Sequence, residues 1–80
     1  SAMAHHLLLL GGTSEARALA MRLAARGDLR VTLSLAGRTA NPAALPVPVR
    51  VGGFGGAEGL AEYLRAERVQ VLLDATHPYA

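Results

Sequence analysis

The chain has 80 residues, 51% of them hydrophobic, which suits one small globular domain with a thin core. It contains no cysteine, so disulfides and cysteine-ligated zinc sites are excluded. The eight basic residues are all arginine and are spread along the chain, and a net charge of +2 without a basic cluster argues against a nucleic-acid partner.

The first predicted element is a strand over residues 7–10, a run of four leucines. The run is too short to cross a membrane or to form the apolar core of a secretory signal, but it suits a strand buried on both faces of a parallel sheet. We therefore expect a cytoplasmic protein with no membrane partner.

Residues 1–2, ahead of Met3, look like a cloning remnant. We interpret His5 and His6 as residues at the strand start rather than metal ligands.

A glycine pair follows this strand directly, and a helical pattern begins right after it. Gly11 and Gly12 allow a tight turn and a close approach of the backbone to a ligand. The helix predicted over residues 14–26, with Thr13 or Ser14 as its cap, offers unpaired amides to an anion. Because the two glycines are adjacent, the spacing departs from G-x-G-x-x-G, and two interpretations stay open: a nucleotide-phosphate site, or a tight turn without a ligand.

The predicted helix has one apolar stripe that would face a sheet. The stripe consists of Ala16, Leu19, Ala20, Leu23 and Ala24. Gly27 suits a left-handed position just after the last turn. Glu15 suits the positive end of the helix dipole but would repel a phosphate, unless it points away or pairs with Arg17, and the sequence does not decide this.

A second strand is predicted over residues 30–35, and the order strand–helix–strand makes a right-handed unit with parallel strands. In dinucleotide folds the end of this strand faces the adenosine ribose, where an acidic residue selects NAD and an arginine accommodates the 2′-phosphate of NADP. The segment that follows has no acidic residue and offers Ser34, Arg38 and Thr39 as donors. Taken by itself, Arg38 is better explained as a solvated loop arginine, but the glycine pair upstream favours the phosphate.

Residues 41–48 contain three of the four prolines and predict a loop, and residues 49–51 predict a short third strand. Four of the next five residues are glycine. They can let the backbone pass close to a ligand edge such as an adenine, or they can form a plain flexible connection; Phe54 could be a hydrophobic plug in either case.

A second helix is predicted over residues 57–68, with a buried stripe. That stripe consists of Ala57, Leu60, Ala61 and Leu64.

A fourth strand, residues 69–73, ends at the polar segment 74–78. Ligands of open α/β sheets bind outside the carboxyl ends of the strands, near the point where the strand order reverses. The predicted order is 3-2-1-4, so we expect the glycine pair to lie beside Thr76 and His77. The His77 side chain could donate a proton, bind a substrate carboxylate, or cap a following helix.

Four segments in this order resemble the precorrin-6A reductases of cobalamin biosynthesis. They are LGGTSEAR at 10–17, SLAGRT at 34–39, VGGFGG at 51–56 and DATHPYA at 74–80. The resemblance covers nearly the whole chain from Leu7. It implies a Rossmann-like α/β fold in which residues 1–80 are part of an NADP-binding domain, the second domain being absent. It also implies an enzyme that uses NADPH to reduce one double bond of precorrin-6A, giving precorrin-6B.

The resemblance also implies which residues meet the ligands. The cofactor positions are Gly11, Gly12, Thr13, Ser14, Ser34, Gly37, Arg38, Thr39, Gly52, Gly53, Ala75 and Thr76. The tetrapyrrole positions are Thr76, His77 and Tyr79, with His77 as the candidate catalytic residue. Because one wall of a cleft cannot align two reactants, we expect no turnover by this chain alone. Whether the substrate carries cobalt stays open.

Two other interpretations remain from the residues themselves. The chain could be a regulatory module that binds a nucleotide without catalysis, or a scaffold whose glycines only form turns. The fourth strand should have an unpaired, apolar edge, so we also expect the chain to self-associate through that edge.

Overall fold

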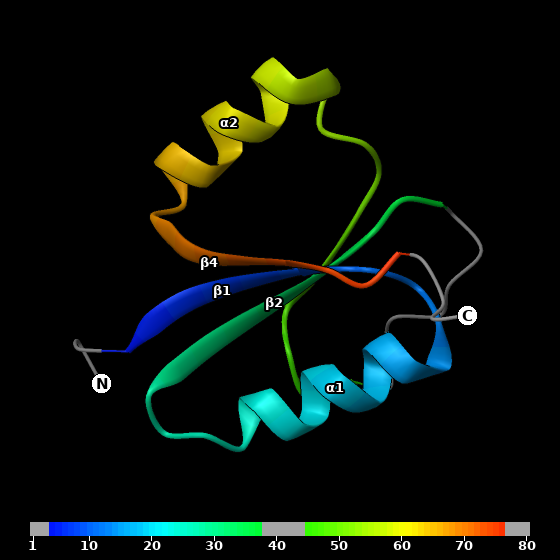
Figure 1. The fold of residues 1–80 in the computed structure, drawn as a ribbon, viewed down its shortest axis with the longest axis vertical. Helices are drawn as coiled ribbons and strands as arrows, with labels where there is room; N and C mark the ends of the chain where they lie inside the picture. Colours follow the sequence, from blue (N-terminus) through cyan, green and yellow to red (C-terminus); the bar gives the residue numbers. More distant parts are fainter. Residues whose placement is uncertain (1–3, 38–44, 77–80) are drawn as a thin grey trace.

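A computed structural model of the chain describes residues 4–37 and 45–76. Its elements are β1 (His5–Leu10), α1 (Ser14–Ala24), β2 (Leu29–Leu35), β3 (Val49–Val51), α2 (Gly56–Ala66) and β4 (Val69–Asp74). The strands form one parallel sheet in the order β3-β2-β1-β4, so the predicted order is confirmed (Figure 1). Among the described residues, neither helix has the length and apolar character needed to cross a bilayer.

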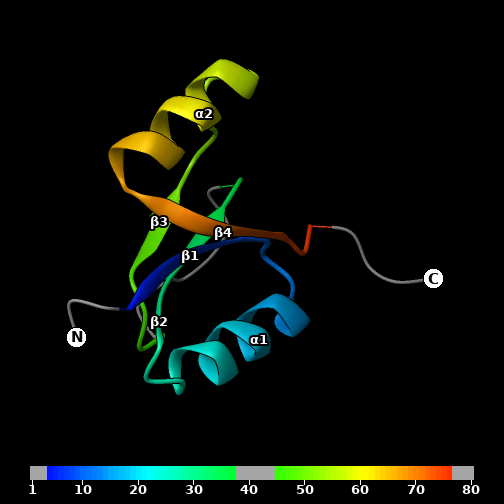
Figure 2. The same cartoon turned by 60° about the vertical axis from the view of Figure 1, so that its left-hand side comes forward.

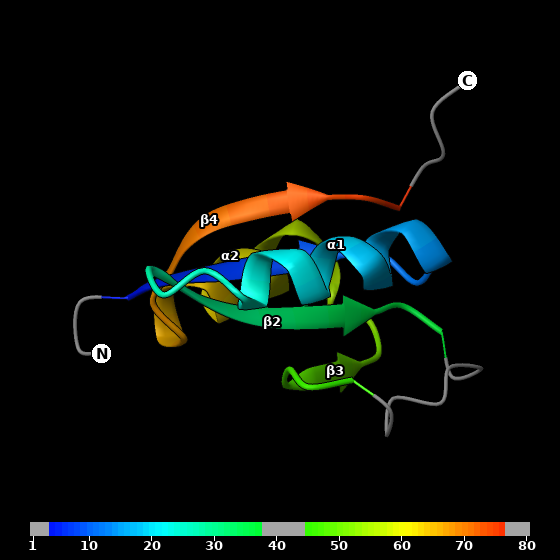
Figure 3. The same cartoon turned by 90° about the horizontal axis from the view of Figure 1, so that it is seen from below.

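The two helices lie on opposite faces of the sheet. Figures 1 and 2 show α1 below β1 and β2, and α2 on the other side near β4. This follows from handedness: β1 to β2 and β3 to β4 are both right-handed crossovers, but they run across the sheet in opposite directions. The strand order therefore reverses between β1 and β4. Figure 3 shows the arrows of β2, β3 and β4 pointing the same way, and β1 pairs in parallel with β2 and β4.

The hydrophobic core fills the layer between α1 and the sheet. It consists of Leu7, Leu9, Ala20, Val31, Leu33, Leu35 and Val47. Ala16 and Ala20 are the fully buried members of the α1 stripe, and Leu23 and Ala24 pack against the core. The prediction that Leu19 is buried was wrong, because 36% of its surface is exposed. Two alanines make the closest approach to the sheet, which leaves Leu19 at the margin of the contact.

The second helix is less buried than its sequence pattern predicts. No residue of α2 is buried; Leu60, Ala61 and Leu64 are half-buried, and Ala57 is exposed. The physical reason is its position: α2 packs beside β4, an edge strand whose residues are themselves half-buried or exposed. An apolar stripe fixes which side of a helix turns inward, but the depth of burial depends on what covers it.

Both helices also end earlier than predicted. The last residue of α1 is Ala24, and Ala25 is its cap, with the Arg26 amide donating to the Leu23 carbonyl at 3.0 Å. The predicted left-handed conformation of Gly27 was wrong, since its φ is not positive. After α2 the left-handed residue is Arg68, with a φ of 54°.

Candidate functional site

The carboxyl ends of the strands meet at one edge of the sheet, and backbone hydrogen bonds hold together the segments that leave them. The Gly11 amide donates to the Ser34 carbonyl at 3.0 Å, and the Gly52 amide donates to Leu35 at 2.8 Å. On the other side, the Ala75 amide donates to the Leu10 carbonyl at 2.7 Å. The glycine turn therefore lies next to the segment after β4, as the predicted strand order required.

Gly11 is buried in this junction. An added Cβ would lie 2.8 Å from the Ala75 carbonyl oxygen and 2.9 Å from the Ala16 Cβ. The glycine therefore permits α1 and the end of β4 to close on the turn from both sides. Gly12, by contrast, is exposed, and its added Cβ would meet only Leu35, at 3.7 Å.

The turn leads into the N-terminus of α1. Thr13 is the cap: its backbone is extended, and its Oγ1 accepts from the Ala16 amide at 3.1 Å. This bond settles the choice between Thr13 and Ser14 as cap. The first helical residues, Ser14 and Glu15, are exposed, and their amides have no acceptor within the helix. Together with exposed Gly12 in front of them, they form a place where an anion could bind backbone donors.

Glu15 lies in the first turn of α1 with its side chain exposed. In the described part of the chain it forms no ion pair with Arg17. The ion pair observed there joins Arg26 Nη2 to Asp28 Oδ2 at 2.7 Å, and this hydrogen bond lowers the pKa of Asp28. That pair lies in the turn between α1 and β2, at the other end of the helix, so it does not affect the glycine turn.

At the end of β2, Ser34 is 4% exposed, and its Oγ accepts a hydrogen bond from Arg50 Nη1 at 2.9 Å. The same guanidinium donates from Nη1 to the Gly52 carbonyl at 3.0 Å and from Nη2 to the Gly53 carbonyl at 3.1 Å. Ser34 was predicted to donate to a phosphate; its oxygen accepts from Arg50, its hydroxyl proton is not used by that bond, and the predicted role stays a prediction. Gly37 is exposed, while Arg38 and Thr39 lie outside the described residues.

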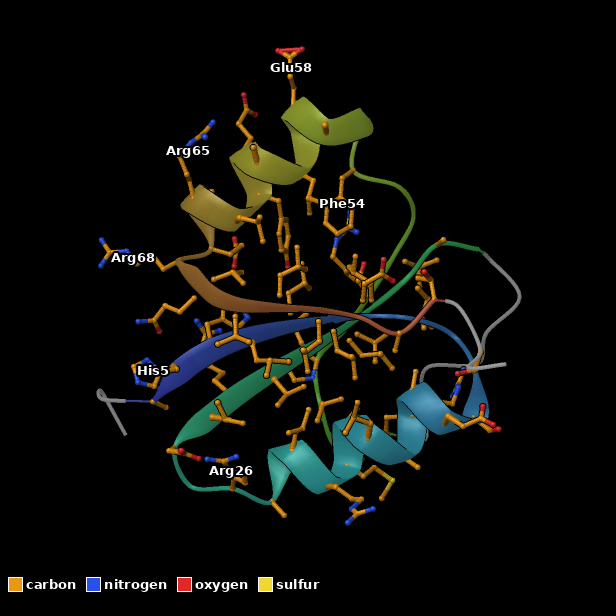
Figure 4. The ribbon with its side chains drawn as sticks, in the orientation of Figure 1. His5, Arg26, Phe54, Glu58, Arg65 and Arg68 are labelled. Carbon is orange, nitrogen blue, oxygen red and sulfur yellow. The ribbon has the colours of Figure 1, made fainter. Side chains whose placement is uncertain are left out.

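Arg50 was missed by the sequence reasoning. Its guanidinium carbon lies 3.8 Å from the centre of the Phe54 ring and 5.1 Å from that of Tyr63. The two rings meet edge to face, with centres 5.2 Å apart. Phe54 is thus packed between the third strand and α2, as expected for a hydrophobic plug (Figure 4). The available signal was an arginine between two valines in a strand, four residues before an aromatic residue in a glycine-rich turn.

An open cleft of about 320 Å³ lies between this turn and α2. Its lining consists of Arg50, Gly53, Phe54, Gly59, Glu62, Tyr63 and Ala66. A larger cleft, of about 590 Å³, lies at the opposite edge of the sheet and includes His5, Arg65 and Arg68, which Figure 4 shows away from Phe54. It is at the amino ends of β1 and β4, where the glycine turn has no access.

After β4 the chain turns on Asp74. Its Oδ1 accepts from the Thr76 amide at 3.0 Å and from the Thr76 hydroxyl at 2.5 Å. Ala75 is half-buried against the core and Thr76 is exposed. His77 and Tyr79 lie outside the described residues, so their predicted roles stay predictions. Within residues 4–37 and 45–76, no three His, Asp or Glu side chains are placed to hold a metal ion.

These features define an α/β protein with a glycine turn at the point where its parallel sheet reverses strand order. The sequence profile of the family described as precorrin-6x reductase CbiJ/CobK matches residues 6–80. The chain therefore belongs to this family.

Individual relatives agree with the family match. The chain is 55% identical over 74 residues to a precorrin-6A reductase of Sinorhizobium sp, covering 92% of this chain and 28% of that protein. It is 57% identical over 75 residues to a precorrin-6A reductase of Mycobacterium tuberculosis H37Rv, covering 92% and 30%. A solved structure, CobK precorrin-6A reductase, superposes with a TM-score of 0.81 at 52% identity, covering 94% of this chain and 30% of that one. The chain thus spans less than a third of the relatives it matches.

Proposed function

We propose that the protein containing this chain is a reductase of cobalamin biosynthesis that uses NADPH to reduce precorrin-6A. Residues 1–80 would supply part of its Rossmann-like, cofactor-binding domain, with a second domain forming the other wall of the cleft. The family match and the relatives named precorrin-6A reductase support the reaction. The observation that carries the cofactor assignment is the convergence of Gly12, the first turn of α1 and the segment after β4 at one sheet edge.

The backbone at this edge fits a dinucleotide phosphate. Thr13 caps α1 with its own side chain, so the amides of Ser14 and Glu15 are left to bind an anion beside exposed Gly12. The positive end of the helix dipole favours the negative charge of a pyrophosphate there. The exposed Glu15 side chain can turn toward solvent, so its carboxylate does not have to face the phosphate.

The two ends of the cofactor would lie on either side of this point. Toward β2 and β3, we propose that Ser34, Gly37, Arg38 and Thr39 bind the ribose 2′-phosphate, with Gly52 and Gly53 along the adenosine. An added Cβ on Gly52 or Gly53 would meet open space, which leaves room for a ligand. Toward β4, Ala75 and Thr76 would border the nicotinamide. Bound NADPH supplies the hydride, and the protein supplies position and electrostatics.

The substrate would approach from the β4 side of the sheet edge. We propose that Thr76, His77 and Tyr79 contact the tetrapyrrole and that His77 is positioned to bind a substrate carboxylate or to donate a proton. The turn fixed by Asp74 directs the chain out of the sheet at this point. A second wall is needed to exclude water and align the ring, so the 80-residue chain alone should not turn over.

The test is an assay of the full-length protein with precorrin-6A and NADPH, following oxidation of the nucleotide by absorbance. We expect substrate-dependent oxidation by the full-length protein and none by residues 1–80 alone. If the full-length protein binds the nucleotide but shows no substrate-dependent oxidation, it is instead a regulatory module that binds a nucleotide without catalysis. Turnover by the 80-residue chain would contradict the requirement for a second wall.

A further inference from the structure

Arg50 joins segments that are distant in the sequence. One nitrogen of its guanidinium reaches Ser34, 16 residues earlier at the end of β2, and the two terminal nitrogens hold the carbonyls of the turn after its own strand. Its planar face lies on Phe54, which in turn contacts Tyr63 of α2. A lysine could not make these contacts, because the fork of an arginine presents several donors in one fixed plane.

The two hydrogen bonds from Arg50 to backbone carbonyls hold the glycine-rich turn after β3, which is the most flexible part of this sheet edge. Gly52 has a φ of 116°, a conformation that side-chain-bearing residues rarely adopt, and the turn contains four glycines. Bonds to the carbonyls of Gly52 and Gly53 orient two successive peptide planes. Without Arg50, these planes would be free to rotate.

Orienting the carbonyls also orients the amides. In a trans peptide the N–H points opposite to the C=O, and the described residues contain no cis peptide. The amides of Gly53 and Phe54 therefore point away from the guanidinium. Neither donates to a backbone or side-chain acceptor in the described parts of the chain. The result is a pair of neighbouring backbone donors on the side of the turn away from Arg50, at and next to the exposed Gly53.

The charge of Arg50 adds to this effect. Its hydrogen-bond acceptors are one hydroxyl and two carbonyls, all of them neutral. Glu62 lines the same cleft, but within residues 4–37 and 45–76 it forms no ion pair with Arg50. The guanidinium thus keeps an unneutralised positive charge at the carboxyl edge, which favours a ligand that is anionic and rich in acceptors.

We propose that Arg50 is a positioning residue that presents the amides of Gly53 and Phe54 to the adenosine phosphate half of the cofactor. This inference rests on the proposed function, because it needs a dinucleotide at the same edge. It differs from the role proposed for Arg38, which is to recognise the 2′-phosphate itself. Arg50 acts through the backbone of the turn, so it affects NADPH and NADH alike.

The experiment compares Arg50→Gln and Arg50→Lys with the control Arg65→Gln in the full-length protein. Arg65 is exposed on α2 and lines the cleft at the opposite edge. Calorimetric titration uses three probes: NADPH, adenosine 2′,5′-bisphosphate and reduced nicotinamide mononucleotide. We expect both Arg50 variants to bind the first two probes about tenfold more weakly, the loss typical of a displaced polar contact. Binding of the mononucleotide should not change, and Arg65→Gln should match the parent protein.

A second readout separates positioning from general stability. Hydrogen exchange of the Gly52 amide, which donates to the Leu35 carbonyl at the base of this turn, should accelerate in both Arg50 variants, while the amides of β1 keep their protection. If Arg50→Lys binds NADPH as tightly as the parent protein does, the positive charge alone is sufficient. That result would contradict the proposal that Arg50 positions the turn. If the parent binds NADPH and Arg50→Gln binds it equally well, this inference alone fails. If the parent binds no nucleotide, the proposed function fails, and this inference with it.

Discussion

His6 is buried at the start of the sheet, yet both nitrogens of its ring have protein partners. Nδ1 lies 2.8 Å from the Glu67 carbonyl, and Nε2 lies 2.8 Å from the Thr32 hydroxyl. A carbonyl can only accept, so Nδ1 carries a proton and, in the neutral ring, Nε2 accepts from Thr32. The His6 amide also donates to Gln70 Oε1, at the point where the β1–β4 register shifts. The side chain thus links β1, β2 and the turn before β4.

Replacing this side chain should destabilise the fold. His6→Phe would leave the buried Thr32 hydroxyl and the Glu67 carbonyl without partners, so we expect a loss of about 2–4 kcal/mol in the free energy of unfolding. His5→Phe is the matched control, because His5 is exposed, and its change should stay within about 0.5 kcal/mol. Urea unfolding followed by circular dichroism measures both. Equal stabilities of the two variants would contradict the structural role of His6.

Single residues also show where sequence reasoning reaches its limit. The sequence predicted correctly that Gly11 and the segment after β4 would be neighbours. It could not predict that Gly11 is required by its contact with Ala75, since that contact joins residues 64 positions apart through the completed fold. In the same way, the sequence could not predict that the Ser34 hydroxyl would accept a hydrogen bond from Arg50.

The elements themselves were predictable because local chemistry decides them. The glycine pair, Thr13 and an alanine-rich repeat indicate where α1 begins. The type and order of all six elements follow from the apolar runs and the glycine turns. Burial was less predictable. The stripe of α1 lies on the two central strands, β1 and β2, whereas the stripe of α2 lies beside an edge strand, and a repeat pattern cannot distinguish these two positions.

Gly59 offers a test of how α2 is held. Glycine in a helix normally weakens it, so alanine there would be expected to stabilise by up to about 1 kcal/mol. In the structure, however, a Cβ on Gly59 would overlap the backbone carbonyl of Phe54. We therefore expect Gly59→Ala to destabilise the protein by about 1 kcal/mol or more, an overpacking effect. Thermal unfolding measures the change.

Gly27→Ala is the control for this substitution, because nothing lies within 4 Å of its added Cβ and its φ is not positive. It should leave stability unchanged or raise it by a few tenths of a kcal/mol, roughly the effect of restricting the unfolded chain. An increase in stability from Gly59→Ala would show that the start of α2 is not packed on the Phe54 carbonyl.

For the whole molecule, the topology follows from two rules that need no side-chain detail: crossovers are right-handed, and ligands gather where the strand order reverses. The parallel order β3-β2-β1-β4 therefore could be predicted, and with it the edge that carries the glycine turn. Which side chains meet across that edge could not, because Ser34, Arg50 and Phe54 come together only after β2 and β3 pair.

The same topology leaves β4 exposed in the described part of the chain. Val71, Leu72 and Leu73 are 37%, 41% and 37% exposed, and β1 is the strand that pairs with β4. We propose that the isolated 80-residue chain self-associates by pairing the β4 edges of two copies. Val71→Lys should abolish the association seen by light scattering, and Met21→Lys, an exposed apolar position on α1, should not. A monomer at all concentrations would contradict this proposal.

The central claim is that this sheet edge binds a nicotinamide dinucleotide and selects its 2′-phosphate. The most direct measurement is calorimetric titration of the full-length protein with NADPH and NADH, repeated with Arg38→Ala and with Arg30→Ala, an exposed arginine on β2 as control. We expect NADPH to bind about tenfold tighter or more, and Arg38→Ala to remove most of that difference while Arg30→Ala preserves it. Binding of neither nucleotide by the full-length protein would contradict the assignment of this edge as a cofactor site.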